Sequence, residues 1–139
     1  LLGDKVIMAN NASVAGHVVV GDYANFGGYS GVPQFRSIGE NTHIAAMSLV
    51  TKDVPAFMTV AGNPASAVGL NLEGMRRRDF STDALAALKE SHKIVYRSGL
   101  TKNKALNRLA ELRSKYSEVE KFARSIESSE SGIVRGRSH

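Results

Sequence analysis

Large apolar residues recur at every sixth position between Leu2 and Val50. They are Leu2, Met8, Val14, Val20, Phe26, Val32, Ile38, Ile44 and Val50. The fifth place of each six is mostly small or β-branched, with Arg36 as the exception, and the second place is repeatedly Gly or Ala. A helix repeats at about 3.6 residues and a strand at about 2, so a period of six predicts a solenoid of short strands and tight corners.

In such a solenoid the first and fifth places of each six face a narrow interior, and the small second place fits the corner. Successive coils then stack at the spacing of neighbouring strands, about 4.8 Å. The pattern resembles the left-handed parallel β-helix of hexapeptide-repeat acyltransferases, in which three sixes close one coil. By that resemblance, residues 2–55 form three coils.

The repeat ends at Lys52–Pro55, and residues 56–61 are expected to form a last extended segment. The sequence Gly62-Asn63-Pro64-Ala65 then predicts a turn, because proline keeps the preceding residue out of the helical region. We therefore expect residues 1–65 to hold the C-terminal coils of the β-helix, and residues 66–80 to hold a linker, from Ser66 to Asn71, and a further segment that leads to the helices.

From Ser81 the apolar period changes to about 3.6 residues, which predicts an α-helical domain over residues 81–139. About three helices are expected, with Ser81, Thr101 and Ser117 as their N-caps. Gly99 ends the first helix, and the second ends near Tyr116. The tail from residue 128 is rich in Ser, Gly and Arg and is expected to fray.

Composition narrows the chemistry. The chain contains no cysteine, which excludes disulfides, cysteine–zinc sites and thiol catalysis. No apolar run approaches the ~18 residues of a transmembrane helix, so no membrane span is expected. Residues 1–75 carry three Lys/Arg against five Asp/Glu, a net charge of −2, whereas residues 76–139 carry 15 against eight, a net charge of +7.

The basic second part is either a solvated helical surface or a surface that attracts an acidic partner. We expect no nucleic-acid partner, because the basic residues are interleaved with glutamates and form no recognisable binding motif. His17 occupies the fourth place of its six, which points outward. Taken alone, an outward histidine is more often a plain surface residue than a functional one.

Several segments of the chain are more specific than the repeat. They are Asn10-Asn11-Ala12-Ser13-Val14-Ala15-Gly16-His17, Pro33-Gln34-Phe35, Gly62-Asn63-Pro64-Ala65, Asn71-Leu72-Glu73-Gly74-Met75-Arg76-Arg77-Arg78 and Tyr96-Arg97-Ser98-Gly99. With these segments, the chain from Leu1 to about Arg135 resembles the C-terminal part of the bacterial UDP-N-acetylglucosamine O-acyltransferases, which catalyse the first step of lipid A biosynthesis.

The resemblance implies a cytoplasmic homotrimer. It would transfer an (R)-3-hydroxyacyl chain from acyl carrier protein to the 3-hydroxyl of UDP-N-acetylglucosamine, at a site between neighbouring β-helices. No cofactor and no metal are implied, and the basic helical domain would receive the acidic carrier protein. The reaction needs a general base, which the resemblance places on a histidine shortly upstream of Leu1. We therefore expect the isolated chain to be inactive.

The resemblance also implies roles for individual residues. His17 corresponds to a histidine that assists catalysis by positioning the substrate, and Asn71, Glu73 and Arg77 match residues that contact the sugar nucleotide. The planar guanidinium groups of Arg77 and Arg78 suit phosphate, which they can bind bidentately. Without the resemblance, the three consecutive arginines at 76–78 are a solvated basic turn before a helix.

Two further site residues follow from the resemblance. Gln34 is expected to contact substrate, next to Pro33, where many relatives have a histidine. Ala46 occupies a place where some relatives have a glycine that leaves room for the acyl tail. Its extra methyl group could shorten the preferred chain.

Three alternatives remain at this point. Another hexapeptide-repeat acyl- or acetyltransferase would share the repeat and the Gly-Asn-Pro-Ala ending, but not the segment Asn71–Arg78. A non-catalytic trimeric scaffold would keep the seam between subunits without substrate affinity. A metal enzyme of this fold needs three convergent imidazoles, whereas His17 and His43 occupy different places in their sixes.

Overall fold

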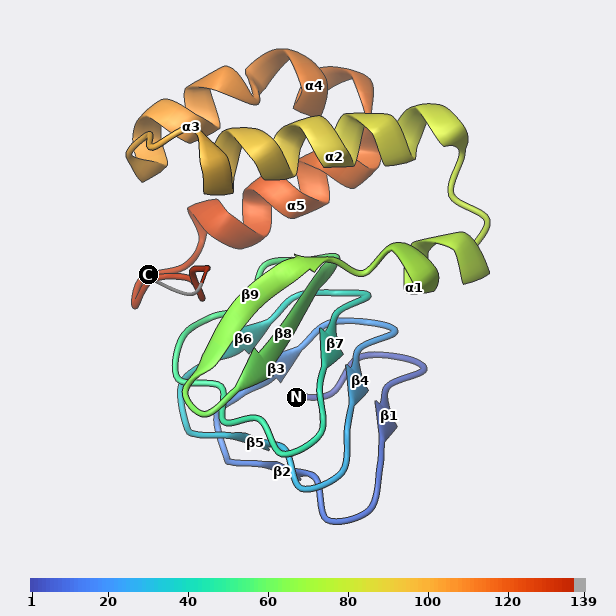
Figure 1. Ribbon diagram of the computed structural model, residues 1–139, viewed down its shortest axis with the longest axis vertical. Helices are drawn as coiled ribbons and strands as arrows, with labels where there is room; N and C mark the ends of the chain where they lie inside the picture. Colours follow the sequence, from blue (N-terminus) through green and yellow to red (C-terminus); the bar gives the residue numbers. More distant parts are fainter. Residues whose placement is uncertain (137–139) are drawn as a thin grey trace.

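The computed structural model describes residues 1–136 as a lower region of short strands beneath a layer of helices (Figure 1). Seven two-residue strands come first: β1 (Ile7–Met8), β2 (Ser13–Val14), β3 (Val19–Val20), β4 (Asn25–Phe26), β5 (Gly31–Val32), β6 (Ser37–Ile38) and β7 (His43–Ile44). Each strand pairs in parallel with the third strand after it, so the pairs are β1–β4–β7, β2–β5 and β3–β6. Every pair is offset by 18 residues, as in Ile7 with Asn25 and Asn25 with His43.

The burial of the strand region follows the period of six. The first-place residues Val20, Phe26, Val32, Ile38, Ile44 and Val50 are all buried, with at most 3% of their surface exposed. The fifth-place residues Val18, Ala24, Ser30, Thr42, Ser48 and Val54 are buried as well. The buried hydroxyls of Ser30 and Thr42 donate to corner carbonyls, at 2.7 and 3.1 Å. The predicted interior positions are therefore confirmed from Val18 onward. In the coil before it, Leu2 and Met8 are exposed, at 53% and 37%, and Val14 is half-buried.

The corners explain the other places of the six. The fourth-place residues Lys5, Asn11, His17, Tyr23, Tyr29, Phe35, Asn41 and Met47 all have φ between 54° and 64°. This left-handed conformation is costly for residues other than glycine. Hydrogen bonds between corners offset the cost: the Tyr23 N–H donates to Asp4 O at 2.9 Å, and the Asn41 N–H donates to Asp22 O at 2.7 Å. A Cβ on the second-place Gly21 would lie 2.5 Å from the Glu40 nitrogen.

A hairpin closes the strand region. Strand β8 (Met58–Gly62) pairs in parallel with β7, and β9 (Ala65–Leu70) returns antiparallel beside β8. The predicted linker at residues 66–71 is therefore wrong for residues 66–70. Residues 66–70 show no clear strand alternation. β9 pairs with β8 across the turn at residues 63 and 64, and on its other edge the distant Arg135 carbonyl accepts from Ala67 N at 2.8 Å.

Five helices follow within the described residues: α1 (Leu72–Arg77), α2 (Thr82–Arg97), α3 (Lys102–Arg108), α4 (Ala110–Lys115) and α5 (Ser117–Glu127). The side chains of Ser81 and Thr101 cap α2 and α3, as predicted. The predicted cap Ser117 is wrong: Ser117 is the first residue of α5, and Tyr116 precedes it without a capping side-chain hydrogen bond. The expected helix from Thr101 to Tyr116 is instead divided at Leu109, which is fully buried. Short helix α1 was not expected, because its segment looks like a basic turn.

The prediction of a frayed tail is wrong for residues 128–136. The Ser129 hydroxyl donates to the buried Asp53 carboxylate at 2.6 Å, and the Val134 N–H donates to Asp53 O at 2.8 Å. Ile133 and Val134 are buried, which fixes the tail against the strand region. Residues 137–139, the end of the predicted helical domain, lie outside the described residues. None of the helices described is long and apolar enough to cross a membrane.

Candidate functional site

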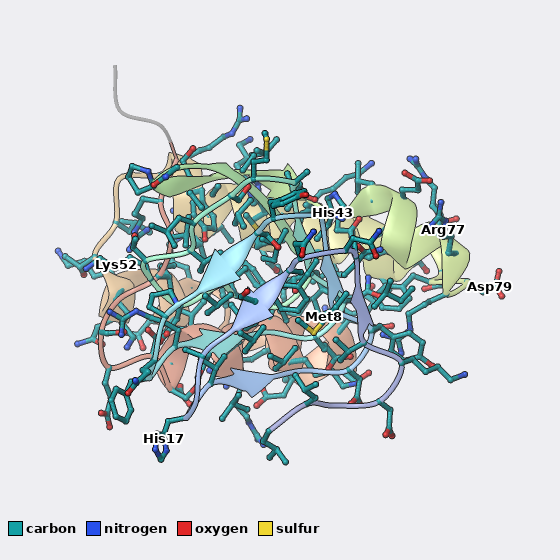
Figure 2. The ribbon with its side chains drawn as sticks, turned by 90° about the horizontal axis from the view of Figure 1, so that it is seen from below. Met8, His17, His43, Lys52, Arg77 and Asp79 are labelled. Atoms are coloured by element: carbon teal, nitrogen blue, oxygen red, sulfur yellow. The ribbon has the colours of Figure 1, made fainter. Side chains whose placement is uncertain are left out.

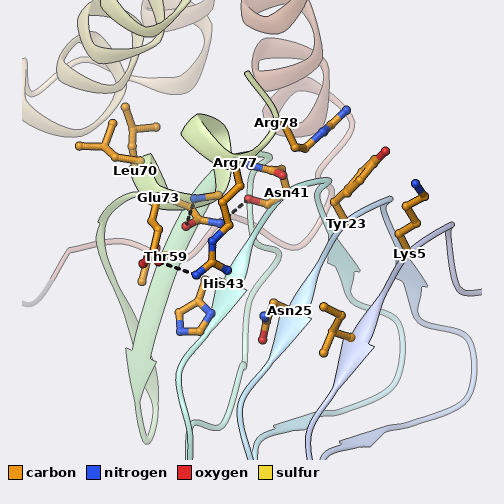
Figure 3. Close-up of a pocket in the computed structure, with 14 residues that line it drawn as sticks. Lys5, Tyr23, Asn25, Asn41, His43, Thr59, Leu70, Glu73, Arg77 and Arg78 are labelled. Atoms are coloured by element: carbon orange, nitrogen blue, oxygen red, sulfur yellow. Dashed lines mark hydrogen bonds and ion pairs between the residues drawn. The ribbon is translucent and has the colours of Figure 1, made fainter. Parts of the chain in front are cut away.

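A cleft of about 600 Å³ opens between α1 and the outer face of strands β4, β7 and β8 (Figure 3). It is lined by Lys5, Ile7, Tyr23, Asn25, Asn41, His43, Thr59, Leu70, Asn71, Leu72, Glu73, Gly74, Arg77 and Arg78. Four predicted site residues, Asn71, Glu73, Arg77 and Arg78, are therefore brought together here. Sequence reasoning found one wall of the cleft and missed the other.

Asn71 fixes the start of α1. Its Oδ1 accepts from Gly74 N at 3.2 Å and its Nδ2 donates to Asn41 O at 2.9 Å, so one side chain caps the helix and ties it to a strand corner. A Cβ on Gly74 would collide with the Asn71 side chain. The spacing Asn71-x-x-Gly74 is thus a structural requirement of this wall, and both ends of the Asn71 amide already have partners.

Glu73 and Arg77 form an ion pair on α1, one helical turn apart. The distance between Arg77 Nη2 and Glu73 Oε1 is 2.6 Å. Both side chains remain about three-quarters exposed, at 75% for Glu73 and 73% for Arg77. An ion pair this open is weak and easily rearranged, so both groups are available to a ligand in the cleft.

Arg78 is held more firmly than Arg77. Its guanidinium carbon lies 3.8 Å from the centroid of the Tyr23 ring, and its Nη1 lies 3.4 Å from Glu40 Oε2. Only 26% of its side chain is exposed. Glu40 is also 3.5 Å from the ammonium group of Lys121 on α5. Arg78 therefore joins α1 to two strand corners while adding positive charge to the cleft.

The other wall of the cleft carries Asn25, His43 and Thr59, which sequence analysis did not single out as site residues. They are partners in register across β4, β7 and β8. Their pairing offsets supply the missing signal: residues 18 apart in the first seven strands share a sheet, so Asn25 and His43 belong to one face. Sequence analysis considered His43 only as a possible metal ligand together with His17. That His43 lies near α1 is decided by the fold and cannot be read from the sequence.

His17 and Gln34 lie outside this cleft. His17 is an exposed corner residue between β2 and β3, and its ring stacks on Phe35 at 5.2 Å between centroids and 12° between planes. Gln34 is exposed beside Phe35, between β5 and β6. Figure 2 shows His17 on one side of the molecule and Arg77 on another. Within one chain, the structure does not bring these two groups of site residues together.

Ala46 lies at yet another corner, after β7, and is exposed. Its backbone packs so closely on Gly27 that a Cβ on that glycine would collide with it. The methyl group of Ala46 does not line the cleft. The predicted site residues thus lie in three places: along α1 at the cleft, at the corners of His17 and Gln34, and at the corner of Ala46.

Two shifted pKa values belong to residues of helix α2. Burial, together with the charge of Arg97, lowers the pKa of His92, whose ring stacks on Tyr96 at 5.0 Å. Burial also raises the pKa of the Tyr96 phenol, which donates to Val134 O at 2.9 Å. Through this bond Tyr96 ties the helical layer to the tail, and the half-buried His92 packs on the Tyr96 ring.

Comparison with known proteins places this geometry in a family. Residues 53–134 match the family described as UDP N-acetylglucosamine O-acyltransferase, domain 2. The acyl-(acyl-carrier-protein)–UDP-N-acetylglucosamine O-acyltransferases of Ectopseudomonas mendocina and Thiobacillus denitrificans are 47% and 45% identical to the chain over 135 residues. Each match covers 97% of this chain and 52% of the relative.

Solved structures agree. The UDP-N-acetylglucosamine O-acyltransferase of Moraxella catarrhalis superposes with a TM-score of 0.91 at 42% identity, covering 95% of this chain and 51% of that protein. The UDP-N-acetylglucosamine acyltransferase of Campylobacter jejuni superposes with a TM-score of 0.92 at 37% identity. The match covers 99% of this chain and 53% of that protein. The chain spans about half the length of the curated relatives it matches. From its sequence and its fold alike, the chain belongs to the UDP-N-acetylglucosamine O-acyltransferase family.

Proposed function

We propose that the protein containing this chain transfers an (R)-3-hydroxyacyl group from acyl carrier protein to the 3-hydroxyl of UDP-N-acetylglucosamine, the first step of lipid A biosynthesis. One observation carries the proposal. The segment that the resemblance assigns to the sugar nucleotide forms a wall of a real cleft, in a chain of the matching family. A linker without function would not need to place Asn71, Glu73 and Arg77 around such a space.

In this proposal Arg77 is the principal phosphate contact. Its guanidinium is open to the cleft and can exchange the Glu73 carboxylate for a phosphate oxygen, which accepts the same kind of charged hydrogen bond. The released Glu73 carboxylate can then accept from a hydroxyl of the nucleotide. Arg78 and Asn71 hold α1 in place and contribute from the wall.

We propose a left-handed parallel β-helix for the strand region, closed by three sixes per coil. The three parallel sheets with 18-residue offsets and the similarity to the family's solved structures support it. We keep the functional division into residues 1–65, 66–80 and 81–139, with the middle part binding the sugar nucleotide. In that division β9 joins the first part to the second.

The complete site requires more than one copy of the chain. His17, Gln34 and Ala46 lie at other corners than the cleft, so we propose that a homotrimer brings these groups from neighbouring copies to one site. His17 would position substrate there, Gln34 would contact it, and Ala46 would limit the acyl tail. The general base upstream of Leu1 stays a prediction, as does the inactivity of the isolated chain.

The basic helical layer is proposed to receive the acyl carrier protein, in the cytoplasm, because opposite charges speed and orient encounter. Both substrates can be tested in the full-length protein. We expect calorimetric binding of UDP-N-acetylglucosamine, and acyl transfer when a 3-hydroxyacyl carrier protein is added. Absence of any affinity for the sugar nucleotide would overturn the proposal in favour of a scaffold. Transfer from acetyl-coenzyme A instead of the carrier protein would indicate another hexapeptide transferase.

A further inference from the structure

The strand wall of the cleft presents a column of polar side chains. Asn25 on β4 pairs in register with His43 on β7, and His43 pairs in register with Thr59 on β8. Neighbouring strands lie about 4.8 Å apart, so the three side chains stack one above another on the outer face. All three are half-buried and line the cleft.

The fold does not require polarity at these positions. On the outer face of β1, the place equivalent to Asn25 and His43 is held by Ile7. On the other two sheets the equivalent places hold Ser13, Gly31, Leu49, Val19 and Ser37. Among the strand faces that the structure describes, only the one inside the cleft carries an amide and an imidazole. Stacking of the strands tolerates apolar residues at these positions, so strand packing does not explain the polar column. Binding of a ligand does.

The charges around the column define that ligand. Lys5, Arg77 and Arg78 line the cleft together with one carboxylate, that of Glu73. Such a balance favours anionic oxygens. Imidazole, amide and hydroxyl groups can each donate a hydrogen bond to an oxygen without adding a carboxylate that would repel it. In Figure 3 the His43 ring projects into the cleft beneath the Arg77 guanidinium.

We propose that His43 is a ligand-contacting residue that donates a hydrogen bond to a diphosphate oxygen of the nucleotide sugar, opposite Arg77. Asn25 and Thr59 flank His43 on the same face. They donate hydrogen bonds to the neighbouring oxygens, directly or through a water molecule. The inference rests on the proposed function and deepens it. His43 belongs to the nucleotide side of the site, whereas His17 serves it from another corner.

The test compares two probes, UDP-N-acetylglucosamine and UDP, by calorimetry on the full-length protein. His43→Leu should weaken both by about tenfold, the loss of one hydrogen bond to a charged group. Leucine fits the position, because Ile7 and Leu49 occupy equivalent outward places. His43→Gln, which keeps a side-chain donor, should recover most of the affinity. His92→Leu removes an imidazole outside the cleft and should leave both affinities unchanged.

The outcomes separate the two proposals. If the unaltered protein binds neither probe, the proposed function fails. If it binds both and His43→Leu binds them equally well, His43 has no part in the site although the function stands. If the variant loses affinity for UDP-N-acetylglucosamine but not for UDP, the diphosphate contact is wrong. If the thermal midpoint of His43→Leu differs from that of the unaltered protein, His43→Ala is used in its place.

Discussion

The guanidinium carbon of Arg78 lies 3.8 Å from the centroid of the Tyr23 ring, across the junction of α1 with the strand region. Lys5 approaches the same ring at 5.7 Å. Arg78 and Arg77 are neighbours in sequence, yet their exposed fractions are 26% and 73%. The contact therefore assigns different tasks to the two arginines. Arg78 is held against the strand corners, whereas Arg77 is paired only with Glu73 and stays exposed at the cleft.

If Arg78 acts by orienting α1, removing either partner of the contact should have a similar effect. We expect Tyr23→Leu and Arg78→Met each to raise the KM for UDP-N-acetylglucosamine with little change in kcat. The double variant should show a coupling free energy of about 1 kcal/mol. Tyr23→Phe keeps the ring and should behave as the unaltered protein. A normal KM in Tyr23→Leu with a raised KM in Arg78→Met would instead mean that Arg78 grips phosphate directly.

Arg77→Ala should raise the KM for UDP-N-acetylglucosamine by about 10- to 100-fold, because it removes a charge-assisted hydrogen bond to phosphate. Steady-state kinetics at saturating acyl carrier protein measures the change. Arg76→Ala is the matched control, since Arg76 is exposed on the same helix but does not line the cleft. If the two substitutions have equal effects, Arg77 contributes only to the positive charge of α1 and makes no specific contact with phosphate.

Gly74→Ala should displace the Asn71 side chain that caps α1 at the cleft, since the new Cβ would collide with it. Loss of an N-cap costs about 1 kcal/mol, and affinity for UDP-N-acetylglucosamine should fall as α1 shifts. Thermal unfolding and calorimetry report the two effects. Gly69→Ala on β9 is the control, because a Cβ there meets no atom within 4 Å. Unchanged binding in Gly74→Ala would show that the cap does not set the site.

His17→Ala in the full-length protein should lower turnover by about tenfold or more while changing stability little. An exposed side chain usually contributes no more than about 0.5 kcal/mol to the free energy of unfolding. The rate of acyl transfer and the thermal midpoint are measured on the same preparation. A normal rate would remove His17 from the site and leave it as a surface partner of Phe35.

Ser129→Ala should lower the free energy of unfolding by about 1–3 kcal/mol, because the buried Asp53 carboxylate loses a hydrogen-bond donor at 2.6 Å. Ser128→Ala is the neighbouring control, since Ser128 is exposed. Denaturant titration of both variants gives the difference. If the two are equally stable, the Ser129–Asp53 bond contributes nothing, and the tail is held by the burial of Ile133 and Val134 and by its backbone hydrogen bonds.

The sequence was sufficient to identify most interior positions and the starts of α2 and α3. A period of six fixes which side chains share a direction, so the burial of Phe26 and Ile44 followed from their places alone. The caps at Ser81 and Thr101 were equally predictable, because a cap bonds to a backbone group only three residues away. The Asn71–Arg78 segment was also recognisable, since its residues are contiguous.

Other features required distant partners. The tail looked irregular because its hydrogen bonds join Arg135 to Ala67 and Val134 to Asp53. Strand β9 pairs with the neighbouring β8, but residues 66–70 lack the apolar–polar alternation by which a strand is recognised. The role of Asn71 as a clamp was hidden because its Nδ2 bonds to Asn41 O, 30 residues earlier. No local propensity reports such partners.

By itself, the sequence of this protein determined a strand repeat, most of the helices that follow it and the segment Asn71–Arg78, part of which lines the cleft. The tertiary structure decided which surfaces face one another. It placed His43 opposite Arg77 and Tyr23 under Arg78, and it separated His17 from both. The reason is physical: periodicity and capping act over a few residues, whereas a cleft is made by strands paired 18 residues apart and a helix docked across them.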